Sequence, residues 1–394
     1  MYSHIAAQQK FGQKPLLICF SHLRWRFVHQ RPQHLLTRAT SDYAVAYFEE
    51  PIFENIGTPN LIKDSTESGV LVLRPVIPSN YSAEETDAAQ RTLLESFLDM
   101  EDPSYSIFWY YTPLALGFTS HLPRDITVYD CMDELSAFKM AHPSLGVFEQ
   151  ELFDQADVVF TGGRSLYEAK KKHHRNIHAF PSSIDAKHFQ KARSRTGCPA
   201  DVANIPGPQI GYFGVIDERM DLELLDQMAR SRPDWNFIMI GPVVKIDEAS
   251  LPTHANIHWL GGRDYHVLPD YIASWDVGLM PFALNESTKF ISPTKTPEYL
   301  AAGCPVISTP IADVVNPYGT AGLVEIAATV RDAIAAGELL MQRDREPWLK
   351  AVDTHLQGNS WDRTWAQMHA EITKCMDTGN SKMITRNMIG ASRV

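Results

Sequence analysis

The residues best suited to chemistry lie between positions 285 and 309, where a loop leads into a short predicted helix. Gly303 fits the end of this helix, because glycine readily adopts the left-handed backbone that follows a helix C-terminus. Ser292 or Thr296, each followed by a proline, can cap the start. The free N–H groups at that start carry partial positive charge, so this helix end predicts an anion site.

Two charged side chains beside this helix start fit the parts of a nucleotide. Lys295 supplies a full positive charge suited to a diphosphate. Glu298, one turn further on, can accept hydrogen bonds from a ribose diol. The alternative is that Lys295 and Glu298 form an ordinary solvated pair three residues apart on a capped helix. The anion-binding helix end favours the first interpretation.

A second candidate segment covers residues 210–226. A predicted strand ends in Gly211 and Gly214, and the following loop carries Arg219 before a helix that Asp221 opens. Glycines allow a ligand to approach the backbone, and an arginine can hold phosphate oxygens with two hydrogen bonds. Strand–glycine–helix joints are common, so this segment carries weight only together with Lys295.

Apolar runs alternate with helical patterns along most of the chain and would position both segments. Continuous apolar runs of this kind predict parallel strands covered on both faces, and the two series predict two doubly wound α/β domains. Both candidate loops then follow strands at the carboxyl edge of the second sheet, where such domains bind ligands. The predicted strands are 15–20, 44–48, 70–73, 107–111, 126–129 and 157–160, then 210–214, 236–241, 256–260, 276–282 and 305–308.

The second half resembles the nucleotide-sugar domain of GT-B glycosyltransferases, family 4 in particular. The resemblance rests on the GYFG segment with Arg219, on residues 259–282, and on residues 292–307, where it is strongest. It implies that the donor-binding residues include Gly214, Arg219, Gly262, Arg263, Ser292, Thr294, Lys295 and Glu298. In that family the arginine and lysine bind the pyrophosphate, the glutamate binds the ribose, and the block around residues 261–265 holds the base.

The first half resembles a subgroup of these enzymes linked to teichuronic-acid-type and other cell-envelope polysaccharides. The matching segments are 20–36, 128–138 and 156–172. The implied architecture is GT-B, with two Rossmann-like domains facing a cleft. We expect an acceptor-binding domain at 1–185, a donor-binding domain at 186–358, a helix at 359–377 that crosses back to the first domain, and a loose tail at 378–394.

One position departs from the family pattern. Many family 4 enzymes carry a glutamate eight residues before the one that corresponds to Glu298, and here that place is Phe290. The nearest acid is Glu286. The transferred sugar therefore cannot be inferred from the resemblance, and backbone amides of residues 290–293 are the alternative contact.

Polar residues after the first predicted strand are candidates for contacts with the acceptor or with donor phosphates. Ser21, Arg24 and Arg26 are assigned to the acceptor, His22 is a candidate catalytic residue, and Arg31 follows on the next helix. The alternative is that the arginines are solvated and His22 is an ordinary surface residue.

Asp130 and Asp133 follow a later strand and could position an acceptor hydroxyl, although helix capping is an alternative role. Of these two aspartates, only Asp133 is assigned a catalytic role. The basic run 170–175 reads as a solvated helix end that could also touch an anionic membrane surface. No carboxylate-rich metal-binding spacing is present, so we expect no metal and no cofactor.

Composition limits the remaining possibilities. The 394 residues include 36 basic and 47 acidic side chains, a net charge of −11, which disfavours general nucleic-acid binding. A 44% hydrophobic composition favours folded cores over disorder. Neither an export signal nor an apolar run long enough to span a bilayer is present, and the scattered cysteines resemble reduced thiols. We therefore expect a cytoplasmic protein, with peripheral contact at the inner membrane face left open.

The combined interpretation is a glycosyltransferase that moves a sugar from a nucleotide diphosphate, with UDP favoured, to a hydroxyl acceptor. The acceptor is a glycan, a lipid-linked sugar or a small molecule. Arg219 and Lys295 would stabilise the leaving diphosphate in place of a metal. Two alternatives remain open: an epimerase or hydrolase of nucleotide sugars, and a non-catalytic subunit that binds them.

Overall fold

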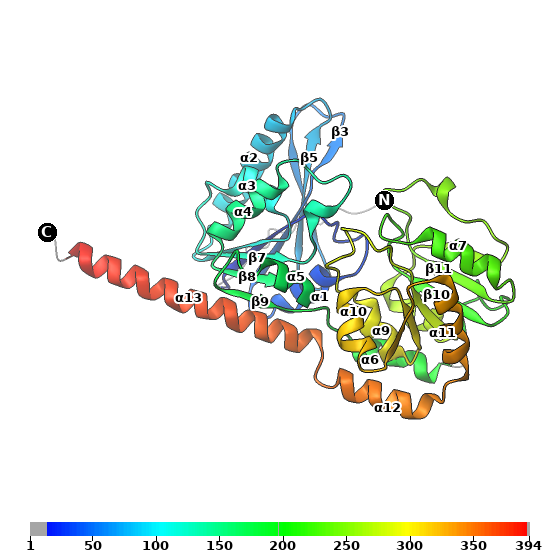
Figure 1. The fold of residues 1–394 in the computed structure, drawn as a ribbon. Coiled ribbons are helices and arrows are strands. Elements are labelled where there is room, and N and C mark those ends of the chain that lie inside the picture. Colours follow the sequence, from blue (N-terminus) through cyan, green and yellow to red (C-terminus); the bar gives the residue numbers. More distant parts are fainter. Residues whose placement is uncertain (1–13, 196, 392–394) are drawn as a thin grey trace.

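The computed structural model describes residues 14–195 and 197–391, with side chains up to residue 377. It contains two α/β domains and a long C-terminal helix (Figure 1). The first sheet has the strand order β3-β5-β2-β1-β6-β7-β8-β9, in which these strands run parallel, and β4 pairs antiparallel with β5. Its strands are β1 (Leu16–Ser21), β2 (Ala44–Glu49), β3 (Ile52–Glu54), β4 (Asn60–Ser65), β5 (Leu71–Pro78), β6 (Ser106–Tyr110), β7 (Ile126–Cys131), β8 (Val158–Thr161) and β9 (Ile177–Ala179).

Helices cover both faces of this sheet. They are α1 (Arg31–Ala39), α2 (Ala83–Glu101), α3 (Leu116–Thr119), α4 (Leu145–Gln155) and α5 (Arg164–Lys170). Strands β1, β2, β6 and β7 are buried along their whole length, because their continuous apolar runs face helices on both sides.

The second sheet is parallel, with the order β12-β11-β10-β13-β14-β15. Its strands are β10 (Gln209–Phe213), β11 (Asn236–Ile240), β12 (Ile257–Gly261), β13 (Val277–Met280), β14 (Val306–Ser308) and β15 (Val324–Ile326). Its helices are α6 (Ala186–Phe189), α7 (Leu222–Ser231), α8 (Leu268–Ile272), α9 (Lys295–Ala302), α10 (Ala312–Val314), α11 (Val330–Gln342) and α12 (Arg345–Leu356). The predicted α/β class and both doubly wound sheets are confirmed.

Each sheet reverses its winding direction next to a central strand. In the first sheet β1 lies between β2 and β6, and in the second β10 lies between β11 and β13. Loops that leave the carboxyl ends of strands on either side of such a point diverge, and the crevice between them is where doubly wound domains bind ligands. We therefore expect the loops after β1 and β10 to line any cleft that the two domains share.

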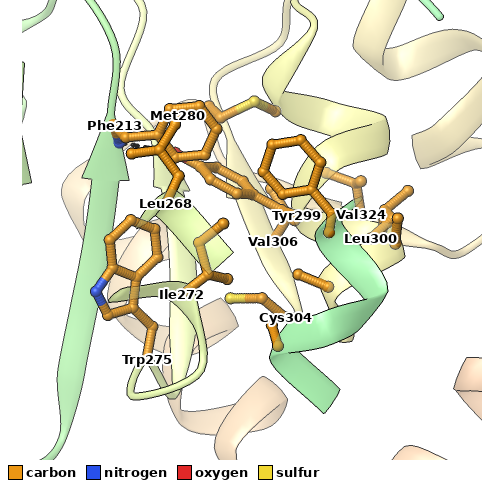
Figure 2. Close-up of a cluster of buried hydrophobic side chains, with 14 of the residues drawn as sticks. Phe213, Leu268, Ile272, Trp275, Met280, Tyr299, Leu300, Cys304, Val306 and Val324 are labelled. Carbon is orange, nitrogen blue, oxygen red and sulfur yellow. Dashed lines mark hydrogen bonds between the residues drawn. The ribbon is translucent and has the colours of Figure 1, made fainter. Parts of the chain in front are cut away.

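A dense apolar cluster fixes helix α9 against the second sheet (Figure 2). The Tyr299 hydroxyl accepts a hydrogen bond from the backbone N–H of Phe213 at 3.0 Å, which joins α9 to β10. Gly211 lies inside β10, and a Cβ there would come within 1.8 Å of the Trp275 ring. The expectation that Gly211 serves ligand approach is wrong, because its missing side chain makes room for this indole.

Helix α13 (Trp361–Ala391) returns from the second domain to the first (Figure 1). Trp361, Trp365 and Met368 are buried in the apolar cluster of the first sheet, as their shared stripe in the sequence predicted. The loose tail expected from residue 378 is wrong as far as Ala391, because the backbone continues as helix; residues 392–394 lie outside the described residues. Among the described helices, none combines the length and apolar character needed to cross a bilayer.

Candidate functional site

A cavity of about 1400 Å³ lies between the two domains. Its wall is formed by the loops after β1, β7 and β8 in the first domain and after β10, β11, β12 and β13 in the second. This volume exceeds the usual range for one small ligand and leaves room for two substrates. All eight predicted donor-binding residues lie on the wall: Gly214, Arg219, Gly262, Arg263, Ser292, Thr294, Lys295 and Glu298.

The start of α9 faces this cavity. The helix begins at Lys295, after Thr294, and no side chain caps its N-terminus. The predicted caps Ser292 and Thr296 are therefore wrong: Thr296 is buried inside the helix with its hydroxyl against the Met280 sulfur at 3.5 Å. Gly303 ends the helix with φ +79°, as predicted. Pro297 has no N–H, and the Thr296 N–H donates to the Pro293 carbonyl at 3.4 Å, so among the described contacts of the first turn the Lys295 N–H is the one left available to an anion.

Lys295 lies in a pocket built by a glycine and two aromatic rings. Gly214 has φ +135°, and a Cβ there would come within 2.2 Å of the Lys295 Cε. The Lys295 Nζ lies 5.4 Å from the centre of the Tyr212 ring and 5.8 Å from that of Phe282. Among the described residues, Lys295 has no ion-pair partner. Burial lowers the pKa of Lys295 below 10.5, and the nearby Arg219 lowers it further.

Glu298 lies on the same wall with only 4% of its surface exposed. Its Oε2 is buried without a hydrogen-bond partner among the described residues. Burial raises the pKa of this carboxyl above 4.5, while Lys295 opposes the shift. A buried acceptor with no donor is costly for a protein to keep, so the site is prepared for a ligand that supplies hydroxyl or N–H donors.

Arg219, the second cation, is held by Asp217. Its Nη2 donates to Asp217 Oδ2 at 2.7 Å, and its guanidinium lies over the Phe138 ring of the first domain at 5.6 Å. Burial alone would lower the pKa of Arg219, but the bonds to Asp217 outweigh burial and raise it. Arg219 therefore keeps its charge at every relevant pH.

The remaining donor candidates take less direct positions. Arg263 has each guanidinium nitrogen bonded: Nε to the Tyr271 hydroxyl, Nη1 to the Gly262 carbonyl and Nη2 to Asp201. The Ser292 carbonyl accepts a hydrogen bond from the Ser182 hydroxyl at 2.5 Å, which ties the loop before α9 to the chain that links the domains. Arg263 thus shapes the cavity wall through contacts with its own domain.

Asp133 and Asp130 have different environments. Asp133 lies on the cavity wall near Arg219, and burial raises its carboxyl pKa. Asp130 is fully buried and accepts two hydrogen bonds from Arg31, one from Nε at 3.0 Å and one from Nη2 at 2.9 Å. This buried pair joins β7 to α1, so the help expected from Arg31 is structural. Asp133 remains the carboxylate available to a substrate.

The candidates after β1 mostly serve the first domain itself. Ser21 is buried and accepts a hydrogen bond from the Tyr47 hydroxyl at 2.7 Å. Arg24 pairs with buried Glu49 at 3.3 Å. Neither is among the residues that line the cavity, so the structure gives their predicted role as acceptor contacts no support. Arg26 does reach the wall, where it pairs with Asp64.

His22 is not among the residues that line the cavity, and its Nδ1 is buried and unpartnered in the described structure. Burial lowers its pKa to about 4, helped by the charges of Lys245 and Arg219. The imidazole is neutral at pH 7. It is therefore a hydrogen-bonding group close to the donor loop, not an exposed surface residue.

Phe290 lies outside the cavity wall and packs against the apolar cluster of the first domain. Lys289 lies over its ring at 5.4 Å. The departure from the family pattern therefore has a structural role, as a contact between the domains. The basic run 170–175 begins at the end of helix α5 and is exposed at Lys171, Lys172, His173 and Arg175, as predicted for a solvated helix end, whereas Lys170 is buried between Glu134 and Glu149. No group of histidine, cysteine or acidic residues within the described chain could hold a metal ion.

Residues 207–342 match a family model described as Glycosyl transferases group 1. The match lies within the second domain. The E. coli structure "Trehalose-6-phosphate from E. coli bound with UDP-2-fluoro glucose" aligns with a TM-score of 0.68 at 11% identity, covering 92% of this chain and 99% of that one. Sucrose-phosphate synthase from Thermosynechococcus elongatus gives 0.68 at 15% identity, covering 93% and 100%. The predicted GT-B fold is thereby confirmed.

A curated bacterial relative carries the same resemblance in sequence. TuaH of Bacillus subtilis strain 168, provisionally named as a teichuronic acid biosynthesis glycosyltransferase, is 24% identical over 245 residues. The aligned part covers 57% of this chain and 62% of TuaH. The resemblance to a teichuronic-acid-type glycosyltransferase, predicted from the sequence, is confirmed as a resemblance.

Asp217 and the stack of Tyr265 with His29 and His188 were not predicted from the sequence. Asp217 accepts a hydrogen bond from the Arg219 guanidinium. An aspartate two residues before an arginine, in a loop that follows a glycine, is a local sequence signal that could have predicted this pair. Tyr265 stacks between His29 of the first domain, at 4.3 Å, and His188, at 4.6 Å. That sandwich joins residues far apart in the chain and has no local sequence signal.

Proposed function

We propose that the protein transfers a sugar from a nucleoside diphosphate donor, most favourably UDP, to a hydroxyl of a glycan, lipid-linked or small-molecule acceptor. The second domain binds the donor and the first domain contributes to the acceptor side. The reaction belongs to polysaccharide or glycoconjugate synthesis, retains the anomeric configuration and uses neither a metal nor another cofactor. The likeness to TuaH supports this class of product.

The observation that carries the proposal is the charge arrangement around the start of α9. Arg219 and Lys295 place two cations beside an uncapped helix end, and the unpartnered Oε2 of Glu298 lies one turn further on. Two cations match a diphosphate, and a free buried carboxylate oxygen matches a ribose diol. Gly262 and Arg263 then form the wall toward the base.

The chemistry follows from this arrangement. The bond between the anomeric carbon and the diphosphate oxygen breaks, and the acceptor oxygen bonds to that carbon on the same face. Negative charge grows on the departing diphosphate, where the side chains of Arg219 and Lys295 and the positive end of helix α9 stabilise it. A departing phosphate oxygen takes the acceptor proton, so no strong protein base is required.

Residues of the first domain would place the acceptor. Asp133 offers a carboxylate on the cavity wall, and His22 offers a buried, neutral imidazole. Both are proposed to orient hydroxyl groups near the reacting carbon. Cys19, Cys131, Cys198 and Cys304 are free thiols, which supports a reducing, cytoplasmic setting. The peripheral membrane contact considered for residues 170–175 stays a proposal that rests on the exposed Lys171, Lys172 and Arg175.

The first test is a thermal-shift screen of UDP-, ADP-, GDP- and TDP-sugars. A donor that binds only the folded protein, and is present at a concentration about 100 times its Kd, should raise the free energy of unfolding by about 2.7 kcal/mol. We expect UDP-sugars to raise Tm most. A panel in which no nucleotide sugar raises Tm would contradict the proposed donor class.

Nucleotide release then separates this function from the alternatives. A transferase releases nucleotide much faster with an acceptor than without one, whereas an epimerase or hydrolase is indifferent to the acceptor. Tight donor binding without turnover across an acceptor panel would indicate a non-catalytic subunit. Phe290 no longer favours that last alternative, since it packs between the domains.

A further inference from the structure

The two cations of the donor site differ in their partners. Lys295 lies over aromatic rings and forms no ion pair among the described residues. Arg219 is bound by the carboxylate of Asp217, which is only 8% exposed. The proposed diphosphate would therefore meet one cation that is free and one that is already paired.

Asp217 holds Arg219 in three ways. Its Oδ1 accepts from the backbone N–H of Arg219 at 3.0 Å and from the Nε, also at 3.0 Å. Its Oδ2 accepts from Nη2 at 2.7 Å. The remaining guanidinium nitrogen, Nη1, has no acceptor among the described contacts. These hydrogen bonds fix the plane of the guanidinium and leave Nη1 available to a phosphate oxygen.

The loop around this pair is held by other bonds, so the Asp217 side chain is not its main support. The backbone N–H of Ala283 donates to the Arg219 carbonyl at 2.8 Å, and that of Asp221 donates to the Pro281 carbonyl at 2.7 Å. From the first domain, the backbone N–H of Lys139 donates to Glu218 Oε1 at 3.2 Å. Removing the charge of Asp217 should therefore leave the loop in place.

We propose that Asp217 is a positioning residue that aims Arg219 at the leaving diphosphate and limits how tightly the nucleotide product is held. The inference rests on the proposed function. A carboxylate in contact with Arg219 offsets part of its attraction for the diphosphate, since both anions compete for one cation. Product release limits turnover in many enzymes, so a weaker hold on the product can favour turnover.

The test combines calorimetric titration of UDP with initial-rate kinetics on the full-length protein and on Asp217→Asn. We expect the variant to bind UDP about tenfold more tightly at low salt, with the gain shrinking at 1 M NaCl. We expect kcat to fall while KM for the donor also falls. A purely structural role would instead weaken UDP binding and lower Tm. Weaker or unchanged UDP binding by Asp217→Asn would overturn the inference.

Further variants separate the effect of the Asp217 charge, and its positioning of Arg219, from the effect of side-chain shape. Asp217→Glu keeps the charge, so its UDP affinity should stay near that of the wild type; tightening equal to that of Asp217→Asn would contradict the inference. In an Arg219→Ala background, Asp217→Asn should cause no further loss of kcat. An equal loss in both backgrounds would mean that Asp217 positions another group. Asp217→Ser provides a second uncharged variant if Asp217→Asn does not fold.

The wild-type titration distinguishes the two levels of the argument. If the wild type binds neither UDP, ADP nor GDP, the proposed function fails. If it binds UDP and Asp217→Asn does not bind more tightly, only the role of Asp217 fails.

Discussion

At the scale of single residues, Lys295 and Glu298 are buried in the cleft with only part of the ion pairing and hydrogen bonding that would offset the cost of removing their charges from water. Burial disfavours both charged forms, lowering the pKa of Lys295 and raising that of Glu298. Neither side chain is ion-paired in the described structure, and Glu298 Oε2 has no hydrogen-bond partner. A ligand that bridges the two would remove this penalty, so binding energy is concentrated there.

The lowered pKa of Lys295 predicts how nucleotide binding depends on pH. Lys295 attracts a diphosphate only when protonated, and it loses its proton at a lower pH than the ordinary 10.5. UDP affinity should therefore decline as pH rises through the alkaline range below 10.5. Lys295→Arg should remove this decline, because arginine stays protonated. Titrations from pH 7 to pH 10 check this; the same decline in Lys295→Arg would show that another group is responsible.

Single residues also show where sequence reasoning holds. Lys295 and Glu298 lie within the first turn of α9, and Gly214 directly follows β10. Because short local motifs mark these positions, the sequence predicted that they belong to one site, and all three line the cavity. Ser21 and Arg24 looked equally polar, but Tyr47 and Glu49 on the neighbouring strand bind them. Those partners are set by the register of β1 and β2, which local spacing does not encode.

At the scale of elements, glycines set how closely helices and loops approach the second sheet. A Cβ added at Gly211 would lie 1.8 Å from the Trp275 ring, and one added at Gly278 would lie 2.9 Å from the Tyr299 ring of α9. Trp275 and Tyr299 belong to the apolar cluster drawn in Figure 2, and this cluster holds the start of α9 at the cavity. The donor site therefore depends on close packing beneath it as well as on its own residues.

Gly211→Ala should destabilise the second domain by about 1–3 kcal/mol, because the added methyl overlaps the Trp275 ring. Gly146→Ala is the matched control, since a Cβ there meets nothing within 4 Å and its helix lies in the first domain. Calorimetric melting should show a lower transition for Gly211→Ala and almost no change for Gly146→Ala. Equal melting curves would contradict the packing argument.

Long, continuous apolar runs allowed the central strands to be predicted, while shorter or polar elements were missed. Strands β3, β9 and β15 have only three residues each, and β4 is mostly polar, so neither length nor hydropathy marks them. The start of α9 was also misplaced, because its capping candidates serve other contacts: Thr296 faces the Met280 sulfur and Ser292 contacts Ser182. Tertiary partners decide such helix ends.

At the scale of the whole molecule, contacts from both domains close around the cavity. Tyr265 of the second domain stacks on His29 of the first, and Phe290 packs on the first-domain cluster. Asp313 accepts hydrogen bonds from the backbone N–H groups of Arg164 at 2.8 Å and Ser165 at 3.0 Å, so it caps α5 across the interface. The structure therefore shows a closed arrangement, in which Arg219 also touches Phe138.

Asp313→Ala should favour opening of the domains, because the interdomain cap contributes about 1 kcal/mol. We expect kcat to fall severalfold and UDP affinity to change little, since Asp313 lies outside the cavity wall. Asp344→Ala, which removes a cap within the second domain, is the control. Small-angle scattering should show a larger radius of gyration only for Asp313→Ala. No difference between the two variants would contradict the role of this cap.

The most direct measurement of the central claim is calorimetric titration of UDP into the wild type, Lys295→Ala and Lys289→Ala. Lys289 lies on the same loop but is exposed and pairs with Glu286, so it controls for the loss of one positive charge. Lys295→Ala should weaken UDP binding about 10- to 100-fold, and Lys289→Ala should bind like the wild type. Equal UDP affinity in the wild type and Lys295→Ala would contradict the assignment of the cleft as the donor site.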